Sequence, residues 1–425
     1  MRLDATMSQS KHLASLSIIV LLITVANWQH LESSFFHSDV TNLRSDSRTC
    51  SAVIRSESNP VNHKPDQFIS PITFKLLADA HYGSSSVPKE HLWDLRRLEL
   101  KYLATCLKPG AVIFVDSNRL RVFFLHVYRS IVVPFVLVSG DTDTPVPGNI
   151  SNKTLAIFFE SPKSLIIHWF AMNCDRNLNA SRFTCLMNGI SQWNGQHEAM
   201  RNAFNDYEGI VAQNMELRDI PVKAVDSIKE INSCEPSIDN HMALTATTKA
   251  KLNNSEEDTF KMGRIVENVY KNNHLKNETF SLLVSFNIKS NIATRQPLWN
   301  QFCDASNRTV KSLCFFSKVD MPTFYRMISS SRFVLSPHGS GLDCYRTYEA
   351  LYFGSYPVVR TSSLDEMFSD LPVLIVNSWS DVTENLLNDT FHRFHGANFN
   401  FDKLFTKYWF LKFRSFGYPS YSYDQ

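Results

Sequence analysis

The chain has 425 residues, of which 44% are hydrophobic and 20% are charged. This length and hydrophobic content exclude a disordered chain and suffice for roughly two domains with packed cores. The 43 basic and 41 acidic side chains leave a formal net charge of +2 at pH 7. Such a balance excludes a global field that would attract nucleic acid, so any substrate has to be recognised by a local arrangement of residues.

The N-terminal region carries a membrane-directed segment at residues 12–28, which contain no Asp, Glu, Lys or Arg. Arg2 and Lys11 precede the segment, so a cytosolic tail at residues 1–11 and a type II orientation are expected. A signal anchor and a cleaved signal peptide both fit its length, which lies at the lower limit for a membrane-spanning helix. We favour the anchor, followed by a polar stem at residues 29–66.

From residue 67 onward, short apolar runs typical of buried strands alternate with segments typical of helices. Strands are predicted at residues 111–116, 132–141, 164–174, 281–287, 333–335 and 371–377, and helices at residues 91–107, 291–303, 321–331 and 342–354. Continuous apolar strands of this kind indicate sheets that are covered on both faces. The sequence therefore predicts two α/β domains in tandem, at residues 67–215 and 216–395, followed by an aromatic C-terminal segment at residues 396–425.

An acidic loop, Asp141-Thr142-Asp143, follows the second of these apolar runs. Two carboxylates at this spacing could hold a divalent cation against a diphosphate. One of them could instead act as a general base, and a plain acidic turn is the third interpretation.

The eight cysteines are compatible with disulfides if this part of the chain is luminal. Cys174 with Cys185 and Cys303 with Cys314 are the short-loop pairs that fit best. No group of Cys and His residues has the spacing of zinc ligands, so no metal site is predicted from them.

Residues 336–341, Ser-Pro-His-Gly-Ser-Gly, form a glycine-containing loop between a predicted strand and the next helix. Such a loop leaves free backbone N–H groups at the positive end of a helix dipole, which is typical of an anion site. The helix is predicted to begin at Leu342 and to end at Gly354, because Gly suits a left-handed C-terminal cap. Arg295, or Lys289 in the same upstream loop, could meet the same anion, and a solvated charge is the alternative for each.

Asp343, Arg346 and Glu349 recur at every third position, so the predicted helix would carry them along one side. Arg346 could neutralise a phosphate, and Glu349 could accept hydrogen bonds from a ribose diol. The alternative is a surface ladder of ion pairs, worth about 0.3 to 0.5 kcal/mol per pair, beside a loop whose glycines only permit a tight turn.

Residues 333–383, which include the run SPHGSGLDCYRTYEALYFGSYPVV, strongly resemble the C-terminal half of exostosin-like glycosyltransferases of family 47. The resemblance implies a GT-B-like fold, in which two Rossmann-like domains face a cleft and the C-terminal one holds most of the sugar nucleotide. It also implies that the C-terminal segment packs back on the N-terminal domain. Tyr345 and Tyr348 stand where His and Trp are common in such runs, so the donor sugar stays open.

The same resemblance assigns roles to residues of the loop and of the helix. It implies that the diphosphate is approached by the loop residues His338, Gly339, Ser340 and Gly341. Arg346 would lie near the diphosphate, and Glu349 would take the ribose or nucleoside.

The residues and the resemblance together predict a glycosyltransferase held in the Golgi membrane as a single-pass type II protein, with its catalytic part in the lumen. It would transfer a sugar from a nucleotide sugar, with UDP-sugars as the expected donors, to a hydroxyl of a glycan or glycoprotein. No metal or further cofactor and no nucleic-acid partner is expected, and Asp141 or Asp143 would be the general base. A metal-dependent transferase centred on these two acids and a non-catalytic glycan-binding protein are the alternatives.

Overall fold

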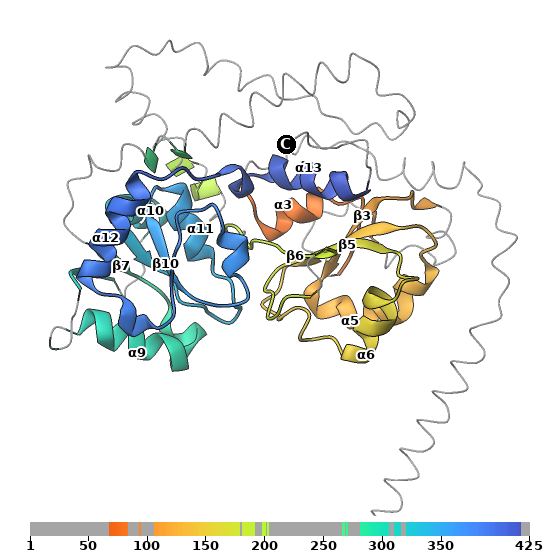
Figure 1. The fold of residues 1–425 in the computed structure, drawn as a ribbon, viewed down its shortest axis with the longest axis horizontal. Coiled ribbons are helices and arrows are strands. Elements are labelled where there is room, and N and C mark those ends of the chain that lie inside the picture. The colour runs from red at the N-terminus through yellow and green to blue at the C-terminus, as the bar shows by residue number, and fades with distance from the viewer. Residues whose placement is uncertain are drawn as a thin grey trace, which may run out of the picture. The chain divides into compact units, whose positions relative to one another are not determined.

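The computed structural model describes two sheets of parallel strands (Figure 1). The described residues are 68–83, 93–94, 106–178, 181–191, 198–200, 202–203, 266–267, 269–270, 281–304, 306, 310–315 and 320–417. The predicted cytosolic tail, membrane span and stem lie outside them. Within the described residues, no helix has both the length and the apolar character needed to cross a membrane.

The N-terminal sheet has six strands in the order β2-β1-β3-β4-β5-β6. Its strands are β1 (Ala80–Tyr82), β2 (Trp93–Asp94), β3 (Ala111–Asp116), β4 (Phe135–Gly140), β5 (Ile166–Ala171) and β6 (Phe183–Cys185), and helices α3 (Pro71–Leu76), α5 (Leu120–Val122) and α6 (Asn152–Leu155) belong to the same part of the chain. β3 and β4 are buried at every position, as their continuous apolar sequences predict. Six residue pairs join them, from Ala111 with Phe135 to Asp116 with Gly140, so both strands end at the same edge of the sheet.

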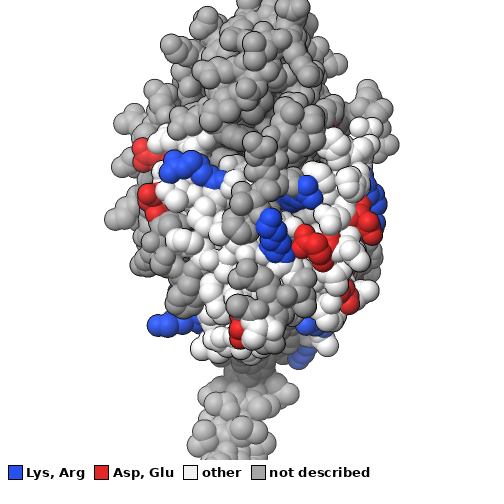
Figure 2. Space-filling view, turned by 90° about the vertical axis from the view of Figure 1, so that its left-hand side faces the viewer, with Lys and Arg blue, Asp and Glu red and all other residues white. Residues whose placement is uncertain are grey.

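The C-terminal sheet has five strands in the order β11-β10-β9-β7-β8. Its strands are β7 (Leu282–Val284), β8 (Ser312–Cys314), β9 (Phe333–Leu335), β10 (Tyr356–Arg360) and β11 (Leu374–Val376), and its helices are α9 (Ile292–Cys303), α10 (Met321–Ser329), α11 (Tyr345–Tyr352) and α12 (Glu384–His395). Two parallel α/β units of this kind fit the predicted GT-B-like class. On the face shown in Figure 2, the described Lys and Arg residues are interspersed with Asp and Glu, as the near-neutral charge predicts.

Both sheets reverse their strand order at the first strand. β1 lies between β2 and β3, and β7 lies between β8 and β9. In open parallel sheets, ligands bind outside the carboxyl ends of the strands at the point where the order reverses, because the loops on either side diverge there. For the C-terminal sheet this point lies between β7 and β9, and the glycine-containing loop begins where β9 ends.

The last described helix, α13 (Thr406–Gly417), lies against the N-terminal sheet. It contacts α3, β3, β4 and β5, and Figure 1 shows it beside α3. Aromatic rings make the contact: Trp409 packs edge-on against Phe74 at 6.0 Å between ring centroids, and Phe413 lies 4.8 Å from Phe170. The apolar area that these rings remove from water holds the C-terminal segment on the N-terminal unit.

Two of the predicted helices have to be corrected. Within the helix predicted at residues 91–107, Trp93 and Asp94 instead form strand β2. This strand pairs with Ala80 and His81 of β1, on the side of β1 that faces away from β3. Residues 95–105 lie outside the described part. The helix predicted from Leu342 begins at Tyr345, because the preceding Cys344 is extended, with φ −126° and ψ 129°. The predicted end is confirmed, since Gly354 has a φ of +72°. Both predicted disulfides, Cys174–Cys185 and Cys303–Cys314, are confirmed as well.

Candidate functional site

The loop between β9 and α11 offers a row of free backbone donors. In the described part of the chain, the N–H groups of residues 338–342 have no hydrogen-bond partner, and no side chain caps the N-terminus of α11. Within this stretch Ser340 is exposed and Gly339 is half-buried. Unpaired backbone donors are rare in folded proteins, and successive ones in a loop can bind an anion. Because α11 begins only at Tyr345, these donors belong to the loop and not to the helix N-terminus that the sequence predicted for them.

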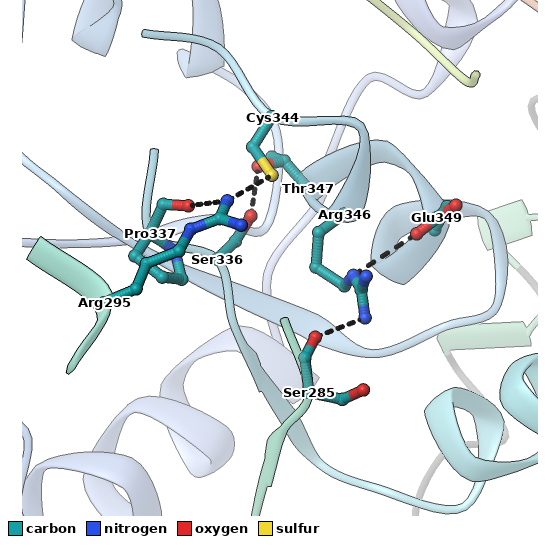
Figure 3. A network of polar contacts seen from close by, with 8 residues as sticks. All are labelled: Ser285, Arg295, Ser336, Pro337, Cys344, Arg346, Thr347 and Glu349. Atoms are coloured by element: carbon teal, nitrogen blue, oxygen red, sulfur yellow. Dashed lines mark hydrogen bonds and ion pairs between the residues drawn. The ribbon is translucent and has the colours of Figure 1, made fainter. Parts of the chain in front are cut away.

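Arg295 on α9 gives this loop its shape (Figure 3). Its side chain is 6% exposed, and its Nε donates to the carbonyl oxygen of His338 at 3.1 Å. Nη2 donates to the carbonyl of Pro337 and to Cys344 Sγ, and Nη1 donates to the carbonyl of Asn287 and to Ser290 Oγ. These contacts occupy all five N–H donors of the guanidinium. Arg295 therefore ties the segment after β7 to the glycine-containing loop after β9, whereas the sequence suggested a direct contact with an anion.

Arg346 and Glu349 form an ion pair on α11, with 3.4 Å between Nε and Oε2. Arg346 also donates to the carbonyl of Ser285, directly after β7 (Figure 3). Its guanidinium carbon lies 4.3 Å from the centroid of the Phe324 ring. The Glu349 side chain is 7% exposed and that of Arg346 is 21% exposed. Burial raises the pKa of Glu349, and the charge of Arg346 opposes this shift. The pair is thus a partly buried contact, and only Arg346 has an appreciable surface open to a ligand.

Asp343 is separate from that pair and connects the glycine-containing loop to the N-terminal sheet unit. Its carboxylate accepts hydrogen bonds from Asn188 N–H at 2.8 Å and from Tyr348 Oη at 2.6 Å, and its own N–H donates to Asn173 Oδ1 at 2.9 Å. Burial raises the pKa of Asp343 to about 6, although these hydrogen bonds lower it. The side-chain ladder that the sequence suggested for residues 343, 346 and 349 therefore does not include Asp343.

The two acids of the loop after β4 have different surroundings. Asp141 Oδ2 lies 2.5 Å from Nζ of Lys75, a fully buried lysine of α3 that also pairs with Asp116 Oδ1 at 3.0 Å. Asp143 is exposed and makes no hydrogen bond or ion pair with any described residue. Its Oδ1 would lie 2.9 Å from a Cβ added to Gly341, so the free carboxylate borders the glycine-containing loop.

Tyr345, the first residue of α11, lies near the same acids. Burial raises its pKa, and the charges of Asp143 and Asp141 raise it further. The structure thus brings together the loop at residues 338–342, the start of α11 and Asp143, which come from parts of the chain about 200 residues apart.

The remaining predicted residues lie around the loop. His338 is half-buried with Nε2 3.3 Å from Thr294 Oγ1, and burial lowers its pKa. Ser340 Oγ donates to the carbonyl of Ser290 at 3.4 Å. Among the described residues, no group of three His, Cys, Asp or Glu side chains could hold a metal ion. Sequence reasoning missed Lys75 and Asn173, although Asn173 follows an apolar strand at the same sheet edge as Asp141.

One comparison with known families matches the C-terminal part of the chain. Residues 296–415 match the family model described as the RXYLT1 C-terminal domain. The match includes the glycine-containing loop, α11 and α12, and it confirms the resemblance to exostosin-like glycosyltransferases. Arg295 and the whole N-terminal sheet lie before it. No curated protein matches the chain.

Proposed function

We propose that the protein is a glycosyltransferase that moves a sugar from a nucleotide sugar to a hydroxyl group of a glycan or glycoprotein. The observation that carries the proposal is that the carboxylate of Asp143, which has no partner among the described residues, lies beside Gly341. Gly341 belongs to the loop in which the N–H groups of residues 338–342 have no hydrogen-bond partner in the described part of the chain. The family match over residues 296–415 supports a sugar nucleotide as the ligand of that loop.

The donor diphosphate would bind to the free N–H groups of residues 338–342. Backbone donors fixed in place stabilise charge that develops on a leaving group, and they need no reorganisation during the reaction. Arg346, partly exposed at the next turn, would add a positive charge close to the departing nucleotide. Arg295 would contribute indirectly, because its guanidinium holds the loop carbonyls in place. A ribose contact by Glu349 stays a prediction, since its carboxylate contacts Arg346 here.

Asp143 would be the general base. As the bond between the anomeric carbon and the diphosphate oxygen breaks, the acceptor oxygen forms a new bond to that carbon and its proton passes to the Asp143 carboxylate. A single displacement of this kind inverts the anomeric configuration. Asp141 is the poorer candidate of the two predicted acids, because Lys75 already pairs with its carboxylate.

A donor screen tests the proposal. The purified protein is mixed with a panel of UDP-, GDP- and CMP-sugars, including UDP-xylose and other pentosyl donors, and with a panel of glycan acceptors. We expect release of free nucleotide from one donor class, faster in the presence of an acceptor. Saturable glycan binding without nucleotide release from any donor would instead support the non-catalytic alternative. Loss of transfer in the presence of a chelator would support the metal-dependent one.

The location of the enzyme in the cell is part of the same proposal. Residues 12–28 would anchor it in the Golgi membrane, with the residues from 67 onward in the lumen. The two disulfides support an oxidising compartment. Protease protection of the C-terminal part in sealed Golgi vesicles, lost when detergent is added, is the expected result.

A further inference from the structure

Asn173 lies between the acidic loop and the glycine-containing loop. It follows β5 by two residues, is 1% exposed, and has a φ of +52°, a conformation that Asn adopts more readily than most residues. Its side chain contacts both loops at the point where they meet.

Both ends of the Asn173 side-chain amide are used. Nδ2 donates to the carbonyl of Thr142 at 2.9 Å, and Oδ1 accepts from Asp343 N–H at 2.9 Å. A donor and an acceptor are required at the same time, and a carboxamide supplies both. In addition, a Cβ on Gly341 would lie only 2.8 Å from Oδ1, so Asn173 also limits how closely the glycine-containing loop can approach.

The two contacts fall on either side of the proposed reaction site. Thr142 separates Asp141, which is tied to Lys75, from Asp143, which has no partner among the described residues. Asp343 directly follows the free N–H groups of residues 338–342. One buried amide thus connects the loop that carries the base to the loop that would carry the donor.

We propose that Asn173 is a positioning residue that holds the Asp143 carboxylate at a fixed distance from the donor-binding loop. This inference rests on the glycosyltransferase function proposed above. Asn173 does not touch substrate, and its effect is exerted through the Thr142 carbonyl and the Asp343 N–H. The Asp343 carboxylate also accepts a hydrogen bond from Asn188 N–H, a contact that does not involve Asn173, so we expect the two sheet units to stay in contact when the amide is removed.

The inference predicts a loss in the chemical step without a matching loss in donor binding. A displacement of about 1 Å in a reacting group can cost about 10²-fold in rate. For Asn173→Ala we expect kcat to fall about 10²-fold while the Kd for the nucleotide sugar stays within twofold. Asn173→Asp keeps the acceptor for Asp343 N–H but repels the Thr142 carbonyl, so it should lose kcat as well.

Gln301→Ala provides the matched control. The Gln301 side-chain amide also donates to a backbone carbonyl, that of Trp379, but on a part of α9 that does not contact either loop through this bond. We expect kcat and Kd to be unchanged in this variant.

The experiment compares the variants by steady-state kinetics, donor titration calorimetry and hydrogen exchange over residues 141–144. Faster exchange in Asn173→Ala, but not in Gln301→Ala, together with the selective loss of kcat supports the inference. Unchanged exchange overturns it whether or not the wild-type protein is active, and so does a kcat within twofold of wild type in both Asn173 variants. Failure of the wild-type protein to act on any nucleotide sugar would instead overturn the proposed function.

Discussion

The carboxylate of Asp143 borders Gly341, so that a side chain at residue 341 would have to displace it. A Cβ on Gly341 would come within 2.9 Å of Asp143 Oδ1, below the separation that real Cβ atoms show. Asp143 follows a strand of the N-terminal sheet, and Gly341 follows a strand of the C-terminal sheet. The N-terminal sheet unit thus supplies a carboxylate to the glycine-containing loop of the C-terminal one.

Gly341→Ala is expected to push the two loops apart. The added methyl group costs about 1 to 3 kcal/mol of stability, as is typical of overpacking, and should lower transfer by about 10²-fold because it displaces Asp143. Gly396→Ala is the control, since a Cβ at Gly396 meets no atom within 4 Å. Thermal melts and transfer assays measure both effects. Equal activity of the two variants would contradict the proximity of Gly341 and Asp143.

Arg295→Lys should weaken donor binding about tenfold or more. Arg295 directs five N–H donors to the segment after β7, the glycine-containing loop and Cys344, whereas a lysine ammonium has three donors and lacks the planar fork. The positive charge is retained, so the loss would report loop geometry. Arg326→Lys, at an exposed position of α10, is the control. Calorimetric titration with the donor measures the difference in Kd between the two variants. An unchanged Kd in Arg295→Lys would contradict the claim that Arg295 holds the glycine-containing loop in its donor-binding conformation.

Asp343 should make stability depend on pH. Burial raises its pKa from 3.8 to about 6, so the native state favours the protonated form. The stabilising contribution is therefore fully present below pH 3.8 and is lost as the pH rises through about 6. Asparagine does not titrate, so the free energy of unfolding of the wild type, relative to that of Asp343→Asn, should fall by about 3 kcal/mol between pH 3.5 and 7. Urea unfolding of both proteins across this range measures the effect. A constant difference would show that Asp343 is not held in a desolvated site.

Lys75→Met should destabilise the N-terminal unit by about 3 to 5 kcal/mol. The substitution leaves the carboxylates of Asp116 and Asp141 buried without the ammonium that pairs with both of them. Adding Asp116→Asn and Asp141→Asn to the same protein removes both negative charges and should restore part of the loss. Urea denaturation of the single and triple variants tests this, and equal stability of Lys75→Met and wild type would contradict it.

The sequence predicted those parts of the fold that local patterns determine. β3 occupies the predicted residues 111–116, because a short apolar run rich in β-branched and aromatic residues favours a strand buried on both faces of a parallel sheet. The α9 helix begins where Asn291 accepts a hydrogen bond from Thr294 N–H, which is the usual role of Asn at a helix start.

The start of α11 and the arrangement of the site depend on distant contacts that no local pattern reveals. Asp343 lies outside the helix because Asn188 N–H and Asn173 Oδ1, about 160 residues away, hold it. The difference between Asp141 and Asp143 likewise depends on Lys75, a fully buried lysine that no local pattern connects to either acid. Sequence spacing placed both acids after one strand, but only the packing of α3 distinguishes the paired carboxylate from the free one.

The most direct test of the central claim is the kcat of Asp143→Asn at saturating donor and acceptor, measured beside Asp141→Asn. A general base contributes typically 10²- to 10⁴-fold. We therefore expect Asp143→Asn to lose about that factor in kcat, with an unchanged donor Kd and melting temperature. Asp141→Asn should chiefly lose stability, because its carboxylate pairs with Lys75. A kcat for Asp143→Asn within twofold of the wild-type value would contradict the assignment of Asp143 as the base.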